Sequence, residues 1–287
     1  MSSSFRRQTN IEIEEEAMCI AAWSWQAHHG YQLVLLLNRD EYHERPTEAV
    51  AWWGDGEKRI LGGRDRLAGG TWLGCSKDGR LAFLTNFREP CSIPSSKSRG
   101  DLPVRFLEST KSLLEFSEEI AKEADQYNGF NLILVDLCMK VMVYVSNRPK
   151  GKPVTVQLVS PGLHVLSNAN LDTPWDKAQR LGKNFEELLM KQEGEVHQKE
   201  MIEKLMQDTT KADRDRLPYT GCDVEWELEL SSIFIDINTK QGRYGTRSAI
   251  ALYVRKNEVS LFERYLENGL WKEHTFQFQI EVCQKEG

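Results

Sequence analysis

Residues 18–41 read MCIAAWSWQAHHGYQLVLLLNRDE, and this stretch decides the fold. Residues 18–25 are apolar and aromatic, which favours a β-strand, and residues 31–37 form a second apolar run after a turn at residues 28–30. Two short strands with a compact connection predict an antiparallel hairpin. The polar group NRDE at residues 38–41 follows the second strand, so it is expected beside the beginning of the first.

Short strands and two helical regions account for the rest of the chain. The sequence predicts hairpins over residues 131–146 and 154–166, and later strands at 233–237, 246–254, 259–265 and 275–282. Apolar residues at helical spacing predict one helix over residues 101–124, with Asp101 as its N-cap, and further helices at 173–190 and 196–206. With no repeat and no Gly- or Pro-rich linker, residues 18–287 are expected to form a single α+β domain of stacked sheets flanked by helices.

Composition excludes several classes of protein. The chain has 287 residues, of which 40% are hydrophobic and 28% charged, which is ordinary for a globular domain. Its net charge of -6 argues against a nucleic-acid partner, because such proteins need a basic face. The longest apolar run, near residues 33–37, is far shorter than the roughly 20 residues of a membrane-spanning helix. We therefore expect a cytoplasmic protein with no transmembrane segment.

The cysteines and histidines do not form a recognisable metal site. The six cysteines contain no C-x-x-C pair, and the six histidines no H-E-x-x-H spacing. No secretory signal precedes them, so reduced thiols and no metal are expected. Residues 1–17 resemble neither a signal peptide nor a transit peptide, and they predict a disordered N-terminal tail.

Cys19 allows two interpretations. A lone cysteine in an apolar strand is usually a small core residue. If Met18 becomes the effective start and is removed, Cys19 instead carries a free α-amine with a pKa near ~8, which accepts the thiol proton and makes Cys19 a nucleophile. Position alone does not decide between these interpretations.

Other polar residues at strand ends suit an active site around this thiol. Arg39 and Asp40 would hold the amine and lower the pKa of the thiol. Asn86 and Asn168 would donate to an oxyanion, and Arg247 would bind a carboxylate or phosphate. Each also has an ordinary structural role, because Asn ends many strands and Arg–Asp pairs are common salt bridges.

Several blocks of the sequence resemble the NRDE family, which is named for the residues at 38–41. The chain begins this pattern with MCI at residues 18–20, and the later blocks look like those of the family in the same order: GGTWLG at 69–74, LTN at 84–86, YNGFNL at 127–132, LSN at 166–168, TPW at 173–175 and GTR at 245–247. Within the family, the pattern is most similar to the transport and Golgi organisation protein 2 homologues.

This resemblance implies a four-layer αββα sandwich of two mainly antiparallel sheets, similar to the N-terminal-nucleophile hydrolases such as the bile-salt and penicillin amidases. Carried over residue by residue, the resemblance implies that Cys19 is the nucleophile and that Arg39 and Asp40 support it. It also implies that Asn86 and Asn168 lie around the oxyanion and that Arg247 lies at the far wall of the site. The amidases space their Arg and Asp more widely than Arg39 and Asp40. Family members also usually begin at the Met-Cys pair. Here residues 1–17 precede that pair, and with them attached the nitrogen of Cys19 is an amide that cannot act as a base.

The family is associated with Golgi organisation, secretion and mitochondrial haem and lipid handling, but it has no settled reaction. The resemblance therefore leaves two functions open. In the first, the protein binds a small hydrophobic ligand such as haem or an acyl-CoA, with Arg39 or Arg247 at its acidic group and Trp72 in an apolar wall. It would need no cofactor and would associate peripherally with the Golgi or mitochondria. In the second, it is a cysteine amidohydrolase that cleaves a non-peptide C–N bond in a small amide. The blocked amine favours the first.

Overall fold

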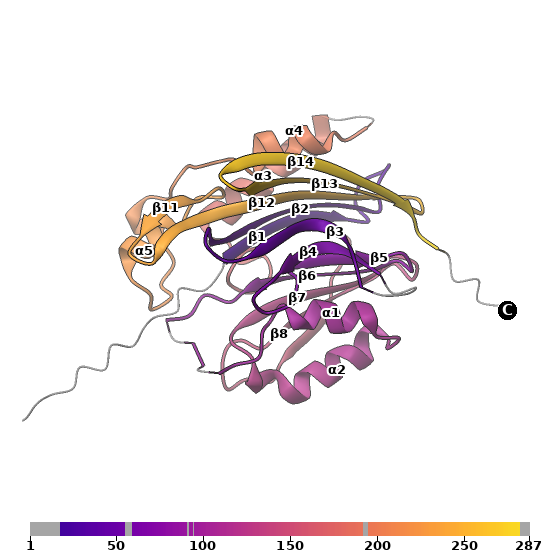
Figure 1. The fold of residues 1–287 in the computed structure, drawn as a ribbon, viewed down its shortest axis with the longest axis horizontal. Helices are drawn as coiled ribbons and strands as arrows, with labels where there is room; N and C mark the ends of the chain where they lie inside the picture. The colour runs from indigo at the N-terminus through magenta and orange to yellow at the C-terminus, as the bar shows by residue number, and fades with distance from the viewer. Residues whose placement is uncertain (1–17, 55–58, 91, 94, 192–194, 282–287) are drawn as a thin grey trace, which may run out of the picture.

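Two stacked β-sheets with helices on both outer faces make up the protein (Figure 1). The computed structural model describes residues 18–54, 59–90, 92–93, 95–191 and 195–281, and the predicted tail at residues 1–17 lies outside them. The layers run α3 and α4, sheet A, sheet B, then α1 and α2. This is the α+β, four-layer αββα arrangement that the sequence predicted.

Every pair of neighbouring strands described in the two sheets is antiparallel. Sheet A consists, in spatial order, of β10 (Gly162–Leu166), β1 (Met18–Trp25), β2 (Leu33–Tyr42), β12 (Gly242–Arg255), β13 (Glu258–Glu267) and β14 (Leu270–Gln279), with β11 (Asp236–Thr239) beside β12. Sheet B consists of β3 (Thr47–Trp53), β4 (Ile60–Asp65), β5 (Leu73–Ser76), β6 (Arg80–Asn86), β7 (Phe130–Asp136), β8 (Val141–Ser146) and β9 (Thr155–Leu158).

The helices cover the outer faces of the two sheets. Sheet B is covered by α1 (Asp101–Glu108) and α2 (Leu113–Glu123), and sheet A by α3 (Asp176–Lys191) and α4 (Gln198–Leu205). The remaining helical segments are short: α5 (Val224–Glu229) and the 3-10 turns η1 (Ala124–Gln126) and η2 (Arg214–Arg216).

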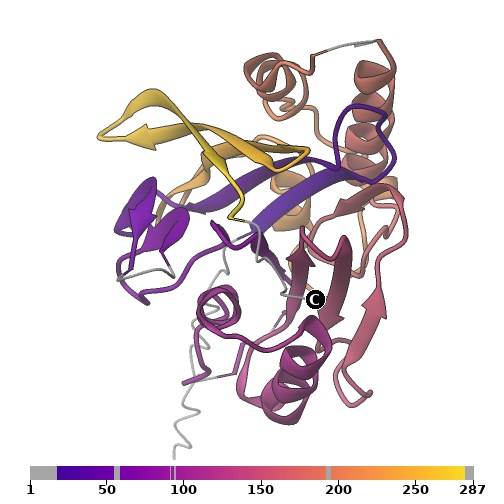
Figure 2. The same ribbon diagram turned by 90° about the vertical axis from the view of Figure 1, so that its right-hand side faces the viewer.

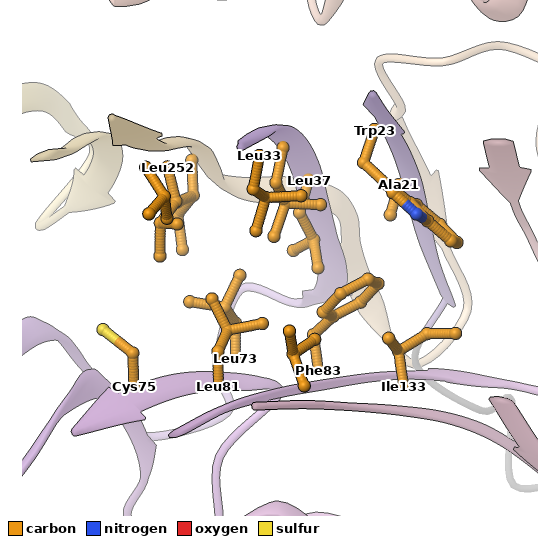
Figure 3. Packing of buried hydrophobic residues seen from close by; sticks show 14 of the residues in the cluster. Ala21, Trp23, Leu33, Leu37, Leu73, Cys75, Leu81, Phe83, Ile133 and Leu252 are labelled. Atoms are coloured by element: carbon orange, nitrogen blue, oxygen red, sulfur yellow. The ribbon is translucent and has the colours of Figure 1, made fainter. Parts of the chain in front are cut away.

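Strand β1 is buried along its whole length because both faces of sheet A are covered. Alternate side chains serve different cores: Trp23 points into the core between the sheets, and Ala22 into the core under α3 and α4. Figure 3 shows the inter-sheet core, where Leu33, Leu37 and Leu252 of sheet A face side chains of sheet B.

The predicted hairpin of residues 18–37 is confirmed as β1 and β2. The strand predicted at residues 233–237 begins later, as β11 at Asp236–Thr239. Three other predictions were wrong. The helix over residues 101–124 is interrupted, because Ser112 and Glu115 form a capping box that begins α2. Asp101 is the first residue of α1 rather than its N-cap, which is Gly100. Residues 154–166 do not form a hairpin either, since β9 pairs with β8 in sheet B and β10 with β1 in sheet A.

Candidate functional site

The β1–β2 hairpin places Cys19 directly opposite Arg39 in the antiparallel register. Both residues line a cleft of about 700 Å³. Trp72 and Asn86, whose chain segments belong to the other sheet, line the same cleft. Four of the predicted site residues therefore meet at one cavity, although they are far apart in the sequence.

Two glycines allow the walls of this cleft to approach one another. A Cβ atom on Gly63 would lie 2.2 Å from the indole ring of Trp72, and a Cβ atom on Gly70 would lie 2.4 Å from the backbone of Gly100. Trp72 can therefore lie flat against β4, and residues 96–100 can form a rim of the cleft. A side chain at either position would displace a wall of the site.

Arg39 is a buried cation whose polar contacts with the described residues are loose. Its side chain is 4% exposed, and its guanidinium lies 4.4 Å from the centre of the Trp72 ring. The guanidinium nitrogens are 3.3 Å from Thr47 Oγ1, 3.5 Å from the Glu41 carboxylate and 4.0 Å from the Asp65 carboxylate. Close charge-assisted bonds are about 2.7–2.9 Å long, so Arg39 retains capacity for an anion.

The Cys19 thiol is protonated in this environment. Burial is the main cause that raises its pKa to about 12, and the nearby Asp40 carboxylate contributes to this rise. Arg39 lowers the pKa of the thiol but does not outweigh burial. The nitrogen of Cys19 is the amide of the Met18–Cys19 bond and lies within β1. In this form of the chain, neither the thiol nor the nitrogen is activated for catalysis.

A buried charged cluster that the sequence did not reveal lies next to Cys19 around Asp40. Burial raises the pKa of Asp40 to about 7, and it lowers the pKa of Lys177 to about 8. The Thr246 hydroxyl donates a 2.6 Å hydrogen bond to Asp40 Oδ1, while Oδ2 has no partner among the described residues. Lys177 could have been found from its spacing, because it precedes Leu181 by four residues on the apolar stripe of α3.

Asn86 and Asn168 are linked through a hydrogen bond, but they face different cavities. Asn168 Nδ2 donates to the Asn86 carbonyl at 3.0 Å, and the Ser167 hydroxyl donates to Asn168 Oδ1 at 3.2 Å. Asn168 lines a small separate cavity of about 20 Å³. Its amide therefore holds the end of β6 in place, and its role at an oxyanion stays a prediction.

Arg247 lines a second cavity of about 390 Å³ rather than the Cys19 cleft. Its guanidinium donates to the carbonyls of Tyr42 and Arg45 and to Thr47 Oγ1. Arg39, Arg45 and Trp72 line both cavities, and Arg39 and Trp72 form a common wall between them. The sequence thus placed Arg247 near the site, but on the other side of this wall.

Neither a metal centre nor a membrane span is found in the described part of the chain. No group of three or more His, Cys, Asp or Glu side chains there could hold a metal ion. No helix in the same residues combines the length and the apolar character needed to cross a bilayer.

Comparison with known proteins gives a consistent family. The family model described as Transport and Golgi organisation 2 matches residues 18–268. The transport and Golgi organization 2 homologs of Mus musculus and Homo sapiens are each 30% identical to this chain, over 92% of it and 100% of their own lengths. The Drosophila melanogaster transport and Golgi organization protein 2 is 25% identical over 82% of the chain and 86% of its own length.

Solved structures are more distant. A Caenorhabditis elegans ortholog of N-acylethanolamine-hydrolyzing acid amidase is 12% identical over 64% of this chain and 84% of its own, with a TM-score of 0.40. A mutant conjugated bile acid hydrolase from Clostridium perfringens is 11% identical over 91% of this chain and 96% of its own, with a TM-score of 0.43. Likenesses this low carry no weight for the ligand or the reaction.

Proposed function

Because the chain belongs to the transport and Golgi organisation 2 family, we propose that its Cys19 cleft binds a hydrophobic ligand that carries a carboxylate or phosphate. Haem and long-chain acyl-CoA are the candidate ligands, and escorting them would support Golgi organisation, secretion and haem or lipid handling. In this proposal the protein works in the cytoplasm and associates peripherally with the Golgi or mitochondria.

The observation that carries the proposal is the state of Arg39. A buried guanidinium is costly unless it is paired, and the shortest polar contact of this one is 3.3 Å. Arg39 also lies on the wall of a cleft large enough for a small molecule. A carboxylate or phosphate in the cleft would supply the close, bidentate partner that Arg39 lacks.

The rest of the cleft suits an amphiphile. Trp72 and Leu84 contribute apolar surface next to Arg39. Lys97 and Arg99 lie on the rim formed by residues 96–100, where Lys97 pairs with the Glu123 carboxylate at 2.7 Å. An apolar body would lie against Trp72 and Leu84, and its acidic group would reach Arg39.

Ligand titration with a matched pair of variants tests the proposal. Haem and a long-chain acyl-CoA are titrated into the full chain, and tryptophan fluorescence or haem absorbance reports binding. Arg39→Gln is expected to raise Kd at least about tenfold, because it removes a charge-assisted bond. Arg64→Gln is the control, since Arg64 also stacks on a tryptophan, Trp53 at 5.1 Å, but is exposed and lies outside the cleft. Equal affinities for wild type and Arg39→Gln would contradict the proposal.

A second candidate, a cysteine amidohydrolase, is favoured by one observation: Cys19 lines the cleft, and the neighbouring Asp40 has an unpartnered, buried Oδ2. In a chain that begins at Cys19, this carboxylate would be available to the new α-ammonium. The test measures hydrolysis of small amides by protein whose N-terminus at Cys19 has been verified by mass spectrometry. Turnover that Cys19→Ala abolishes would support the hydrolase, and no turnover would reject it.

A further inference from the structure

We propose that the second cavity, beyond the Arg39–Trp72 wall, is a separate binding site for an oxyanion group, held between Arg247 and Arg39. The site accepts a carboxylate or phosphate. It shares Arg39, Arg45 and Trp72 with the Cys19 cleft, whereas its other lining residues do not line that cleft.

Positive charge is crowded at the wall of this cavity. Arg39 and Arg247 approach the same hydroxyl, Thr47 Oγ1, at 3.3 and 3.2 Å. Arg247 forms no ion pair with any described carboxylate, and its bonds go only to carbonyls and to Thr47. Burial, and after it the charge of Arg39, lower the pKa of Arg247 to about 10. Two like charges held this close are stabilised by an anion between them.

Guanidinium groups outnumber carboxylates around the Arg39–Trp72 wall. Three guanidinium groups and two carboxylates lie there, namely Arg39, Arg45, Arg247, Glu41 and Asp65. Arg45 takes the close bond to Asp65, at 2.7 Å, so Arg39 and Arg247 have no close ion pair among the described residues. An anion in the cavity would supply one.

The other acidic groups of this cavity do not supply that anion. Glu48 pairs with Arg66 at 3.3 Å, and Glu267 pairs with Lys272. Glu263 lies 2.8 Å from His274 and accepts bonds from Ser248 and the Val50 amide. Glu44 is exposed to solvent. His43, which also lines the cavity, has a pKa lowered by burial and by nearby arginines.

A shift of strand register occurs beside this cavity in each of the two sheets. The register of β12 against β2 shifts between Thr246 and Ser248, so Arg247 is the extra residue of a β-bulge. The register of β3 against β4 also shifts, between Glu48 and Ala51. Bulges re-aim side chains and are common beside functional sites. Here one bulge comes from each sheet, and both contribute to the lining of the cavity.

The cavity has walls from distant parts of the chain. Residues 46–49 of the β3 segment and residues 265–269, at the turn between β13 and β14, line it. These two segments face each other at one edge of the sandwich (Figure 2). The cavity is therefore lined by segments of both sheets.

Anion titrations on the full chain test the proposal. The unfolding temperature is followed while inorganic phosphate or acetate replaces chloride at constant ionic strength. The concentration for the half-maximal rise is expected to increase at least about tenfold in Arg247→Gln. It should stay unchanged in Arg243→Gln, which alters an exposed arginine on the same strand that pairs with Asp236. The proposal is overturned if Arg247→Gln responds to both anions as the wild type does.

A pair of cavity-filling variants keeps the test decisive even if Arg247→Gln does not fold. Ala49 lines only the second cavity of the two, and Ala68 lines only the cleft. Ala49→Phe should abolish the phosphate response and leave binding of haem or acyl-CoA intact, whereas Ala68→Phe should do the reverse. If phosphate still raises the unfolding temperature of Ala49→Phe, the second site is rejected, and the proposal for the cleft is unaffected.

Discussion

The reactivity of Cys19 tests the electrostatics of the site most quantitatively. The thiol is expected to react with iodoacetamide about a thousandfold more slowly than a free cysteine at the same pH. Its pKa is raised from 9.0 to about 12, and three pKa units lower the reactive thiolate fraction a thousandfold. With the side chain only 5% exposed, restricted access slows the reaction further.

The assay is timed alkylation of the full chain at pH 7.5, followed by mass spectrometry of the peptides that carry Cys19 and the exposed Cys138. Asp40→Asn should speed labelling of Cys19, because it removes a carboxylate that raises the pKa of the thiol. Arg39→Gln should slow it, because Arg39 lowers that pKa. Neither variant should reach the rate of Cys138, since burial is the main cause. Labelling of wild-type Cys19 within tenfold of Cys138 would refute the reasoning.

Three further predictions concern stability. Phe83→Ala should lower the free energy of unfolding by about 3–5 kcal/mol in urea titrations, because this fully buried ring packs between the sheets; a loss below about 1 kcal/mol would contradict that packing. Ser112→Ala should cost about 1 kcal/mol in the same titrations by removing the capping box of α2, and no change would mean that the capping box does not stabilise the fold. Burial alone would lower the pKa of His164, but bonds to Asp172 and to a backbone carbonyl raise it above 6.5 overall. Its stabilising effect is therefore present below pH 6.5 and is lost as the pH rises through the raised pKa. The free energies of unfolding of wild type and His164→Gln should differ most at low pH. A difference that grows with pH would contradict the assignment.

The hairpin at the centre of the site could be predicted from the sequence, because its signals are local. Residues 18–41 contain two apolar runs, a turn and a polar end, and these determine the register that places Cys19 opposite Arg39. The blocks around Trp72, Asn86 and Arg247 also marked residues that lie at or near the cleft.

Features that depend on packing between distant segments were not visible. Nothing in residues 154–166 indicates that the chain crosses from sheet B to sheet A there, because alternation of apolar residues does not specify which sheet a strand joins. The assignment of Arg247 to a second cavity depends on a β-bulge, which shifts the register by one residue. The spacing of Lys177 on α3 marks it as a buried residue, but it does not show that the lysine lies beside Asp40.

The most direct test of the central claim is an experimental structure of the full chain with bound haem or long-chain acyl-CoA. We expect the acidic group of the ligand within hydrogen-bond distance of the Arg39 guanidinium, and its apolar part against Trp72 in the Cys19 cleft. A ligand bound elsewhere, with Arg39 still surrounded only by Thr47, Glu41 and Asp65, would contradict the account.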